Sequence, residues 1–326
     1  MEYTHLGRTG TKVSRLCLGT MNFGPYTDER ESFRIMDAAF DRGINFFDTA
    51  NVYGGNDAVG VSEEILGKWF TANQEKRDGI ILATKVYGRM GEGPNDARLS
   101  AVHIRKACEE SLRRLKTDHI DLYQFHHIDR ETPWEEIWQE MERLVQAGKV
   151  IYTGSSNFAG WHIAHAQGIA RERHFVGLVC EQSLYNLALR TVELEVLPAC
   201  RAFGLGFIAW SPLAGGALAG MPDKTGNSKT RRTGGGRSEA VRLRLATPVK
   251  AYEDLCRENG LIPAEVALAW LLTNKTVTAP ITGPRTMEQI ESAVAALSIK
   301  LTDDILDKLD AIWPGPGGQA PEAYAW

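Results

Sequence analysis

Residues 44–55 read INFFDTANVYGG: an apolar run ends at Asp48, and Tyr53 follows five residues later. Two other apolar runs also end at an ionisable residue, namely GIILAT (79–84) before Lys85 and IDLYQF (120–125) before His126. Segments of helix length separate these runs, and strands that alternate with helices favour parallel pairing. Since the carboxyl ends of parallel strands meet at one face of a sheet or barrel, we expect these four side chains to share one site.

The same alternation runs through the whole chain of 326 residues. Strand-like segments occur at eight places: residues 16–19, 44–47, 79–84, 120–125, 149–153, 177–180, 206–210 and 277–281. The expected helices include about 29–42, 62–70, one capped by Ser100, one opened by Pro133 at its first turn, and about 286–296 after the last strand. Eight such units fit a single α/β domain over residues 1–326, a (β/α)8 or TIM barrel.

Three further segments lie outside this repeat. The turn-prone residues 8–10 between two short extended segments predict an N-terminal β-hairpin. Residues 222–244 are long, rich in Gly, Lys and Arg and poor in apolar side chains, which indicates either a functional loop or a disordered one. We therefore expect long variable loops at the C-terminal face of the barrel. Residues 313–319, WPGPGGQ, cannot form a helix, and they precede the aromatic end AYAW (323–326).

Charge and composition argue against several classes of function. The formal net charge is −4, so no overall basic character points to nucleic acid. No apolar run is long enough to span a bilayer, and residues 1–5 lack the pattern of a signal peptide. The five cysteines form no CxxC pair or Cys/His cluster, so we expect neither a metal site nor disulfides. Reduced cysteines favour a cytoplasmic location.

Asp48, Tyr53 and Lys85 can be combined into one arrangement for proton donation. A lysine at the end of an apolar strand needs a counter-charge or water, and Asp48 is a natural partner for Lys85. A tyrosine ordinarily has a pKa of about 10, and a neighbouring ammonium lowers it, so Lys85 would tune Tyr53 as a general acid. Taken singly, Asp48 could merely cap a loop and Tyr53 could lie at the surface.

His126 and His127 compete for one position in this site. Neighbouring side chains of a strand point to opposite faces, so only one of the two can face the other three residues. We expect His126 to do so and to donate a hydrogen bond to a carbonyl oxygen. Taken alone, the dipeptide could equally be two solvated histidines near a strand end.

Six segments together resemble the aldo-keto reductases. They follow that family's order at plausible spacing and span nearly the whole chain: residues 45–55, 83–85, 121–127, 154–157, 181–182 and 210–213. The local sequences EQSLYN (181–186) and WSPLA (210–214) are similar to the bacterial branch near the potassium-channel β-subunits. The resemblance implies a barrel fold, a nicotinamide cofactor, and hydride transfer to the carbonyl group of an aldehyde or ketone.

The resemblance also implies a role for each candidate residue. Tyr53 would be the proton donor with Lys85 and Asp48 as its supports, and His126 would orient the carbonyl. Residues at the ends of the fifth to seventh strand-like segments would bind the nicotinamide half: Ser156, Asn157 and Gln182 its carboxamide, and Trp210 its ring. Backbone along the pyrophosphate would come from Ser211, Pro212, Leu213 and Gly215, with further cofactor contacts from Gly19, Thr20 and Met21.

At the adenosine end, the segment GPRTMEQ (283–289) resembles the family's phosphate and adenine site. Gly283 precedes a helix after the eighth strand, where barrels commonly hold phosphate. Arg285 offers planar, bidentate phosphate recognition and would face a 2′-phosphate, with Gln289 at the adenine, so NADP(H) is preferred over NAD(H). Ser292 and Ala293 depart from the Glu and Asn of related enzymes. Lys224 and its basic loop could cover the pyrophosphate or remain solvated.

Two other functions remain open alternatives. One is a regulatory subunit that holds the nicotinamide cofactor as a redox sensor, and the other is a lyase barrel in which Lys85 forms a Schiff base. The substrate would be a small carbonyl compound, and a homo-oligomer is possible. Candidate pocket residues are Tyr26, Tyr87, Arg89, Met90 and the tail from Tyr324 to Trp326, which could close the pocket of its own or a neighbouring chain.

Overall fold

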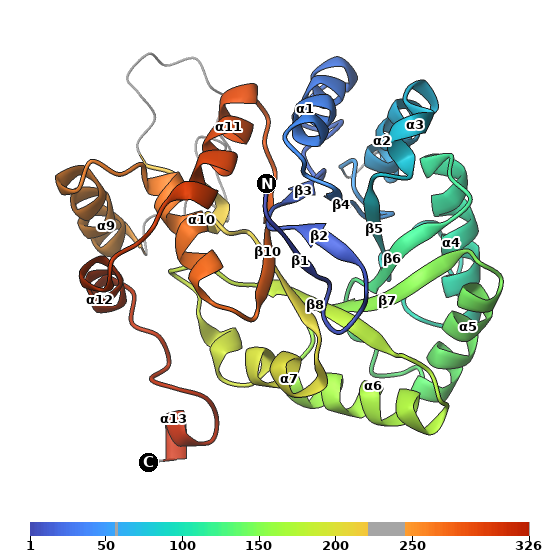
Figure 1. The fold of residues 1–326 in the computed structure, drawn as a ribbon. Helices are drawn as coiled ribbons and strands as arrows, with labels where there is room; N and C mark the ends of the chain where they lie inside the picture. Colours follow the sequence, from blue (N-terminus) through green and yellow to red (C-terminus); the bar gives the residue numbers. More distant parts are fainter. Residues whose placement is uncertain (56–57, 221–244, 326) are drawn as a thin grey trace.

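Eight parallel strands close into a barrel in the order β10-β3-β4-β5-β6-β7-β8-β9 (Figure 1). The computed structural model describes residues 1–55, 58–220 and 245–325. The strands are β3 (Cys17–Gly19), β4 (Phe46–Asp48), β5 (Ile81–Val86), β6 (Ile120–Phe125), β7 (Val150–Ser156), β8 (Leu178–Leu184), β9 (Gly206–Trp210) and β10 (Val277–Thr282). The predicted barrel is therefore confirmed, and so is the N-terminal hairpin of β1 (Tyr3–His5) and β2 (Lys12–Ser14).

Helices surround the barrel and connect successive strands (Figure 1). They are α1 (Glu29–Asp41), α2 (Val61–Ala72), α3 (Gln74–Arg77), α4 (Ala101–Leu115), α5 (Trp134–Gln146), α6 (Gly160–Glu172), α7 (Val196–Phe203), α9 (Ala246–Glu258), α10 (Pro263–Thr273), α11 (Met287–Ala295), α12 (Asp303–Ile312) and α13 (Glu322–Ala325). In the part of the chain that the structure describes, three single 3-10 turns accompany them: η1 (Thr191–Glu193), η2 (Ala214–Gly216) and η3 (Ala296–Ser298). Ser100 caps α4 as predicted, whereas Pro133 stands one residue before the first helical residue of α5.

Two strands are longer than the sequence pattern predicts. β7 extends past residue 153 to Ser156, and β8 extends past residue 180 to Leu184. The added residues are mostly polar. The apolar runs used to predict these strands therefore end before the strands do. All the same they pair in regular register, with Ser155 opposite Glu181 and Ser156 opposite Gln182. Candidate cofactor residues therefore lie within strands or directly after them.

Alternation along the strands decides which side chains enter the barrel. Phe46 packs in the interior cluster, while Phe47 packs in an outer cluster between the strands and helices. The hairpin contributes Leu6 and Val13 to the interior cluster and so closes the amino end of the barrel. Because Phe46 faces the interior, the next inward-facing position is two residues later. That position is Asp48, at the carboxyl end of β4.

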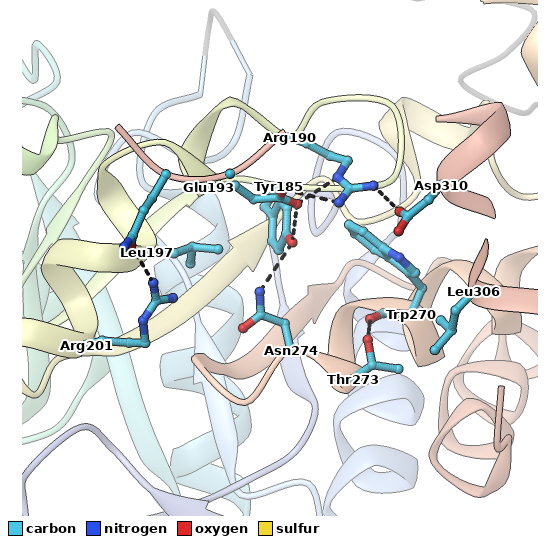
Figure 2. Close-up of a pocket in the computed structure, with 12 residues that line it drawn as sticks. Tyr185, Arg190, Glu193, Leu197, Arg201, Trp270, Thr273, Asn274, Leu306 and Asp310 are labelled. Atoms are coloured by element: carbon cyan, nitrogen blue, oxygen red, sulfur yellow. Dashed lines mark hydrogen bonds and ion pairs between the residues drawn. The ribbon is translucent and has the colours of Figure 1, made fainter. Parts of the chain in front are cut away.

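The C-terminal segment packs on the outside of the barrel, beside η1 and α7. The amide of Ala320 donates to the carbonyl oxygen of Leu194 (2.9 Å), and Arg201 contacts Gln319 (3.2 Å). A cavity of about 560 Å³ lies along this contact. Figure 2 shows the ion pairs that cross it: Arg190 binds Glu193 and Asp310 and lies over the ring of Trp270.

Because the charged side chains of this cavity already bind protein partners, we interpret it as part of a clamp that fixes α12 and the tail. The expectation that the tail closes the pocket of its own chain is not supported by these contacts. They lie with η1 and α7, and the side chain of Tyr324 is exposed. Trp326 lies outside the described residues. Within those residues, no helix combines the length and apolar character that a membrane span needs.

Alanine substitutions at two helical glycines are expected to change the free energy of unfolding in opposite directions. A Cβ atom at Gly67 of α2 would lie 2.0 Å from the carbonyl oxygen of Arg114, whereas one at the exposed Gly168 of α6 would meet nothing within 4 Å. We expect Gly67→Ala to lower the free energy of unfolding by about 1–3 kcal/mol through overpacking. Gly168→Ala should raise it by about 0.5–1 kcal/mol through helix propensity. Urea unfolding of the two variants measures both effects, and a shift in the same direction would contradict this packing.

Candidate active site

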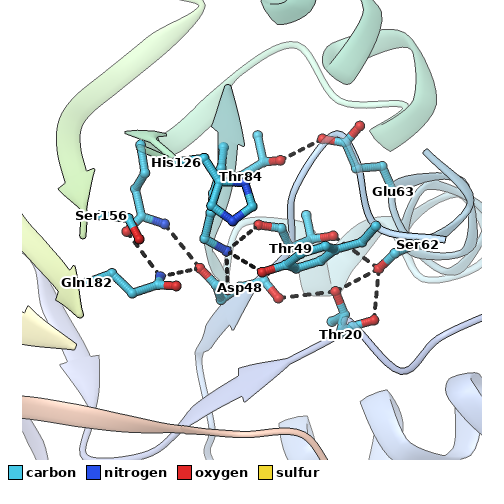
Figure 3. A network of polar contacts seen from close by, with 12 residues as sticks. Thr20, Asp48, Thr49, Ser62, Glu63, Thr84, His126, Ser156 and Gln182 are labelled. Carbon is cyan, nitrogen blue, oxygen red and sulfur yellow. Dashed lines mark hydrogen bonds and ion pairs between the residues drawn. The ribbon is translucent and has the colours of Figure 1, made fainter. Parts of the chain in front are cut away.

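Lys85 is the centre of a buried polar network at the carboxyl end of the barrel. Figure 3 shows the part of this network around Asp48 and Gln182. Its ammonium donates to Asp48 Oδ1 (2.5 Å) and to the carbonyl oxygen of Thr49 (2.8 Å), and it lies 3.2 Å from the hydroxyl of Tyr53. Lys85 and Asp48 are both buried. The structure therefore brings together three of the four residues that the sequence analysis grouped, in the order aspartate, lysine, tyrosine.

The turn after β4 carries Tyr53 back over Lys85. The carbonyl oxygen of Tyr53 accepts hydrogen bonds from the amides of Gly60 (3.1 Å) and Ser62 (3.2 Å), which tie it to the start of α2. Gly54 next to it has φ 146°, and a Cβ there would lie 1.9 Å from the carbonyl oxygen of Ala58. Only glycine fits this close approach, so the sequence Tyr53-Gly54 is what lets the phenol point inward.

The charge states of this network differ in one respect from the sequence prediction. Burial raises the pKa of Tyr53 above its ordinary value, and the opposing effect of the Lys85 charge is smaller. Burial alone would lower the pKa of Lys85, but the charge of Asp48 and the phenol of Tyr53 raise it overall. The prediction that Lys85 brings the pKa of Tyr53 down is thus wrong for the net effect, because burial of the phenol outweighs the lysine charge. The phenol keeps its proton at neutral pH and has one to donate.

His126 lies directly after β6 and faces Tyr53. The two ring centroids are 5.8 Å apart at an interplanar angle of 79°. Burial, followed by the charges of Lys85 and His127, lowers the pKa of His126 to about 3. The imidazole is therefore neutral near pH 7 and can donate one hydrogen bond without carrying a charge. His127 instead lies beside Tyr87, with ring centroids 5.5 Å apart and the rings tilted by 39°, and it is exposed.

Gln124 is a member of the network that the sequence analysis did not identify. Its amide donates to Asp48 Oδ2 (3.0 Å), and Gln182 donates to the same oxygen (2.8 Å) and to Gln124 Oε1 (3.2 Å). Asp48 therefore binds Lys85 through one oxygen and two amides through the other. The sequence does hold a signal that could have identified Gln124. It is a polar residue inside the apolar run 120–125, two positions before His126, so the two side chains point to the same face.

A set of hydroxyl groups holds the turns beside this network (Figure 3). Ser62 Oγ lies 2.8 Å from Thr20 Oγ1 and 3.1 Å from Thr49 Oγ1, and Thr20 donates to the carbonyl oxygen of Asp48 (3.1 Å). The side chain of Thr20 thus already has hydrogen-bond partners within the protein. Met21 next to it is exposed, and Gly19 lies against Ile281 of β10.

The candidate nicotinamide residues converge on Asn157. This residue has a left-handed backbone, with φ 61°. Its side-chain amide donates to Ser156 Oγ (2.9 Å) and to the carbonyl oxygen of His126 (3.2 Å), and its Oδ1 accepts from the indole of Trp210 (3.0 Å). Amide and indole groups are thereby placed beside His126, whose ring faces Tyr53.

Residues 211–216 form a tight turn directly after β9. Ser211, Ala214 and Gly215 all have positive φ, of 54°, 49° and 67°. The amide of Gly215 donates to Ser211 Oγ (3.2 Å), and Asn186 donates to the carbonyl oxygen of Ser211 (2.9 Å). The amides of Ala214 and Gly216 donate to the carbonyl oxygens of Ser211 (3.0 Å) and Leu213 (2.8 Å), so these N–H groups are used within the turn. Pro212 and Leu213 complete the turn.

The segment 283–289 opens α11 after the last barrel strand. The carbonyl oxygen of Gly283 accepts from Asn22 (2.8 Å), and the amide of Arg285 donates to Gln289 Oε1 (2.7 Å). Free N–H groups at a helix start favour a phosphate. Ser292 donates to Glu265 (3.1 Å) and Ala293 is buried, so neither faces an adenine in this structure. Lys224 lies outside the described residues.

The candidate substrate residues lie on different parts of the rim. Tyr26 is exposed, and Tyr87 is partly buried against His127. The guanidinium of Arg89 donates to the carbonyl oxygens of Gly91 and Gly93, within its own loop. Among the described residues there is no group of three or more His, Cys, Asp or Glu side chains that could hold a metal ion.

Comparison with known proteins agrees with this geometry. The model of the aldo/keto reductase family matches residues 15–314. The chain belongs to the aldo/keto reductase family. It is 55% identical to the uncharacterized oxidoreductase YrpG of Bacillus subtilis over the full length of both chains. It is 35% identical to versiconal hemiacetal acetate reductase of Aspergillus parasiticus, over 97% of this chain and 99% of that one.

A further relative, a probable voltage-gated potassium channel subunit beta of Arabidopsis thaliana, is 34% identical over 99% of this chain and all of its own. Membership of the family makes this aldo/keto reductase an oxidoreductase that acts on small carbonyl substrates. Enzymes of this family use NAD(P)H.

Proposed function

We propose that this aldo/keto reductase reduces an aldehyde or ketone to an alcohol with NADPH, and that Tyr53 donates the proton. The observation that carries this proposal is the contact of a buried, charged Lys85 with both Asp48 and the phenol of Tyr53. An ammonium 3.2 Å from the phenol stabilises the phenolate that remains once the proton has left. Such an arrangement supports proton donation to an oxygen that gains negative charge.

Each residue then has a distinct part in the reaction. The cofactor, when bound, supplies the hydride that reaches the carbonyl carbon. Tyr53 gives its proton to the carbonyl oxygen as negative charge develops there, and the neutral imidazole of His126 donates a hydrogen bond that orients the same oxygen. Asp48 holds the charge of Lys85 in place, and the amides of Gln124 and Gln182 fix the second carboxylate oxygen.

The proposed cofactor site runs from Asn157 and Trp210, through the turn 211–216, to the start of α11. The amides and indole at one end fit a carboxamide and its ring, and the backbone of the turn would line the pyrophosphate. Gly283, Arg285 and Gln289 stand at the other end. The guanidinium of Arg285 would bind a 2′-phosphate, which only NADPH carries.

This assignment predicts how Arg285→Ala changes cofactor choice. We expect the Kd for NADPH to rise by about tenfold or more, since a charge-assisted hydrogen bond is worth about 1.5–3 kcal/mol. The Kd for NADH should change by less than about twofold, because NADH has no 2′-phosphate to lose. Titration by nicotinamide fluorescence measures both constants. Arg257→Ala, which removes an exposed arginine of α9, is the control, and equal weakening of both cofactors would contradict the assignment.

Two alternatives can be separated from this proposal. Relatives from Arabidopsis thaliana and Oryza sativa are named as probable channel β-subunits, so a subunit that holds the cofactor without rapid turnover is the second candidate. Turnover at ordinary enzyme rates excludes it. A Schiff base on Lys85 needs a neutral amine, whereas the raised pKa of Lys85 keeps it charged. Borohydride trapping with a carbonyl compound would reveal such a base.

A further inference from the structure

Glu181 is a buried carboxyl group beside the candidate cofactor residues that the proposed reaction does not use. It follows Cys180 on β8, precedes Gln182, and is fully buried. Burial raises its pKa to about 7, and the opposing effects come from neutral hydrogen-bond donors. A buried carboxylate whose partners are neutral costs stability, so its presence here suggests another role.

The partners of Glu181 connect it to the turn after β7. Oε1 accepts from the amide of Phe158 (3.0 Å) and from Ser183 Oγ (2.6 Å), and Oε2 accepts from Ser155 Oγ. Because Phe158 is the residue after Asn157, the carboxyl group of Glu181 holds the far side of this turn.

The turn is sharp because Asn157 has a left-handed backbone, with φ 61°. Asparagine tolerates this conformation better than other residues with a side chain, and hydrogen bonds at both ends of the turn hold it in place. The amide of Asn157 donates to the carbonyl oxygen of Gln182 (3.0 Å), so one end of the turn is fixed by the β8 backbone. The other end is fixed by the Glu181 side chain. Together they keep the Asn157 side chain between His126 and Trp210.

We propose that Glu181 is a positioning residue for the cofactor: it holds the turn 156–158 so that Ser156 and Asn157 present their side chains to the nicotinamide carboxamide. This inference rests on the proposed function, because it requires that the turn bind a nicotinamide. Glu181 acts through Asn157 and touches neither the cofactor nor the substrate. Its loss should therefore weaken cofactor binding while the proton-donating network of Tyr53, Lys85 and Asp48 stays intact.

The test is titration of NADPH into the wild type, Glu181→Met and Glu181→Gln. Methionine leaves the buried amide of Phe158 without an acceptor, and we expect the Kd for NADPH to rise by about tenfold or more. Glutamine keeps one oxygen for that amide, so its Kd should stay within about threefold of wild type. At saturating NADPH and aldehyde, kcat of Glu181→Met should stay within about fivefold of wild type, unlike a variant that lacks the proton donor.

Two controls keep this test decisive. Glu140→Met removes a buried carboxyl group of α5 that binds Arg105 of α4 and Arg143 of α5, and it should lower thermal stability without changing the Kd. Ser183→Ala is the substitute if Glu181→Met does not fold, because it removes one donor from the carboxyl group and should raise the Kd by about threefold. An unchanged Kd in Glu181→Met, or in Ser183→Ala, overturns the positioning role while the proposed function stands. A wild type that binds neither NADPH nor NADH overturns both.

Discussion

Replacement of Tyr53 by phenylalanine is expected to lower kcat for carbonyl reduction by a factor of about 100 to 10,000, the usual contribution of a general acid. The ring remains, so its contacts with His126 and Lys85 persist and the pocket keeps its shape. Only the hydroxyl that lies 3.2 Å from the ammonium is lost. Steady-state kinetics with a reactive aldehyde measures the loss, and the Kd for NADPH should stay within about twofold.

Tyr3→Phe is the matched control for this substitution. Tyr3 lies on β1 of the N-terminal hairpin, its side chain is exposed, and its hydroxyl donates to the carbonyl oxygen of Gly43 (2.9 Å). Removing its hydroxyl should leave kcat within about twofold of wild type. If Tyr53→Phe retained wild-type turnover, the proton would have to come from another group, and the role of Lys85 would have to be reconsidered.

The substitution Lys85→Met should have the largest effect on stability as well as abolishing most turnover. It leaves the carboxylate of Asp48 buried without its cation, and breaking a buried ion pair from one side costs about 3–5 kcal/mol. The remaining amides of Gln124 and Gln182 bind only one of the two carboxylate oxygens. Denaturant unfolding of the variant should show this loss directly.

The double variant Lys85→Met/Asp48→Asn separates charge from packing. Because asparagine removes the unpaired charge, we expect the double variant to recover about half or more of the lost free energy of unfolding. Turnover should not recover, because no ammonium remains beside Tyr53. A single variant as stable as the wild type would mean that Asp48 is protonated or hydrated in the folded protein, contrary to the network described above.

The sequence was sufficient to predict the barrel because its strands and helices alternate regularly. Apolar runs such as 79–84 and 120–125 mark strands on their own, and their ionisable ends share one face once the pairing is parallel. The predicted segments for β7 and β8 end too early, because the last residues of these strands are mostly polar and do not continue the apolar pattern. Those residues are also where the candidate cofactor site lies.

What the sequence could not provide is the cost of burial and the partners of side chains distant in the chain. The net pKa of Tyr53 depends on desolvation, which no spacing reveals. Gln124 binds Asp48 from a different strand, and Glu181 supports a turn that begins more than twenty positions earlier in the chain. Resemblance to a family supplied the candidate roles of Asn157 and Trp210, whereas the contact between them required the structure.

The central claim is that this aldo/keto reductase couples oxidation of NADPH to reduction of a carbonyl group at Tyr53. The most direct measurement is the consumption of NADPH by the wild-type protein with a reactive aromatic aldehyde, together with quantification of the alcohol formed. We expect one alcohol for each NADPH oxidised, at an ordinary enzyme rate. Tight NADPH binding without alcohol from any of a range of aldehydes and ketones would contradict it and favour a cofactor-holding subunit.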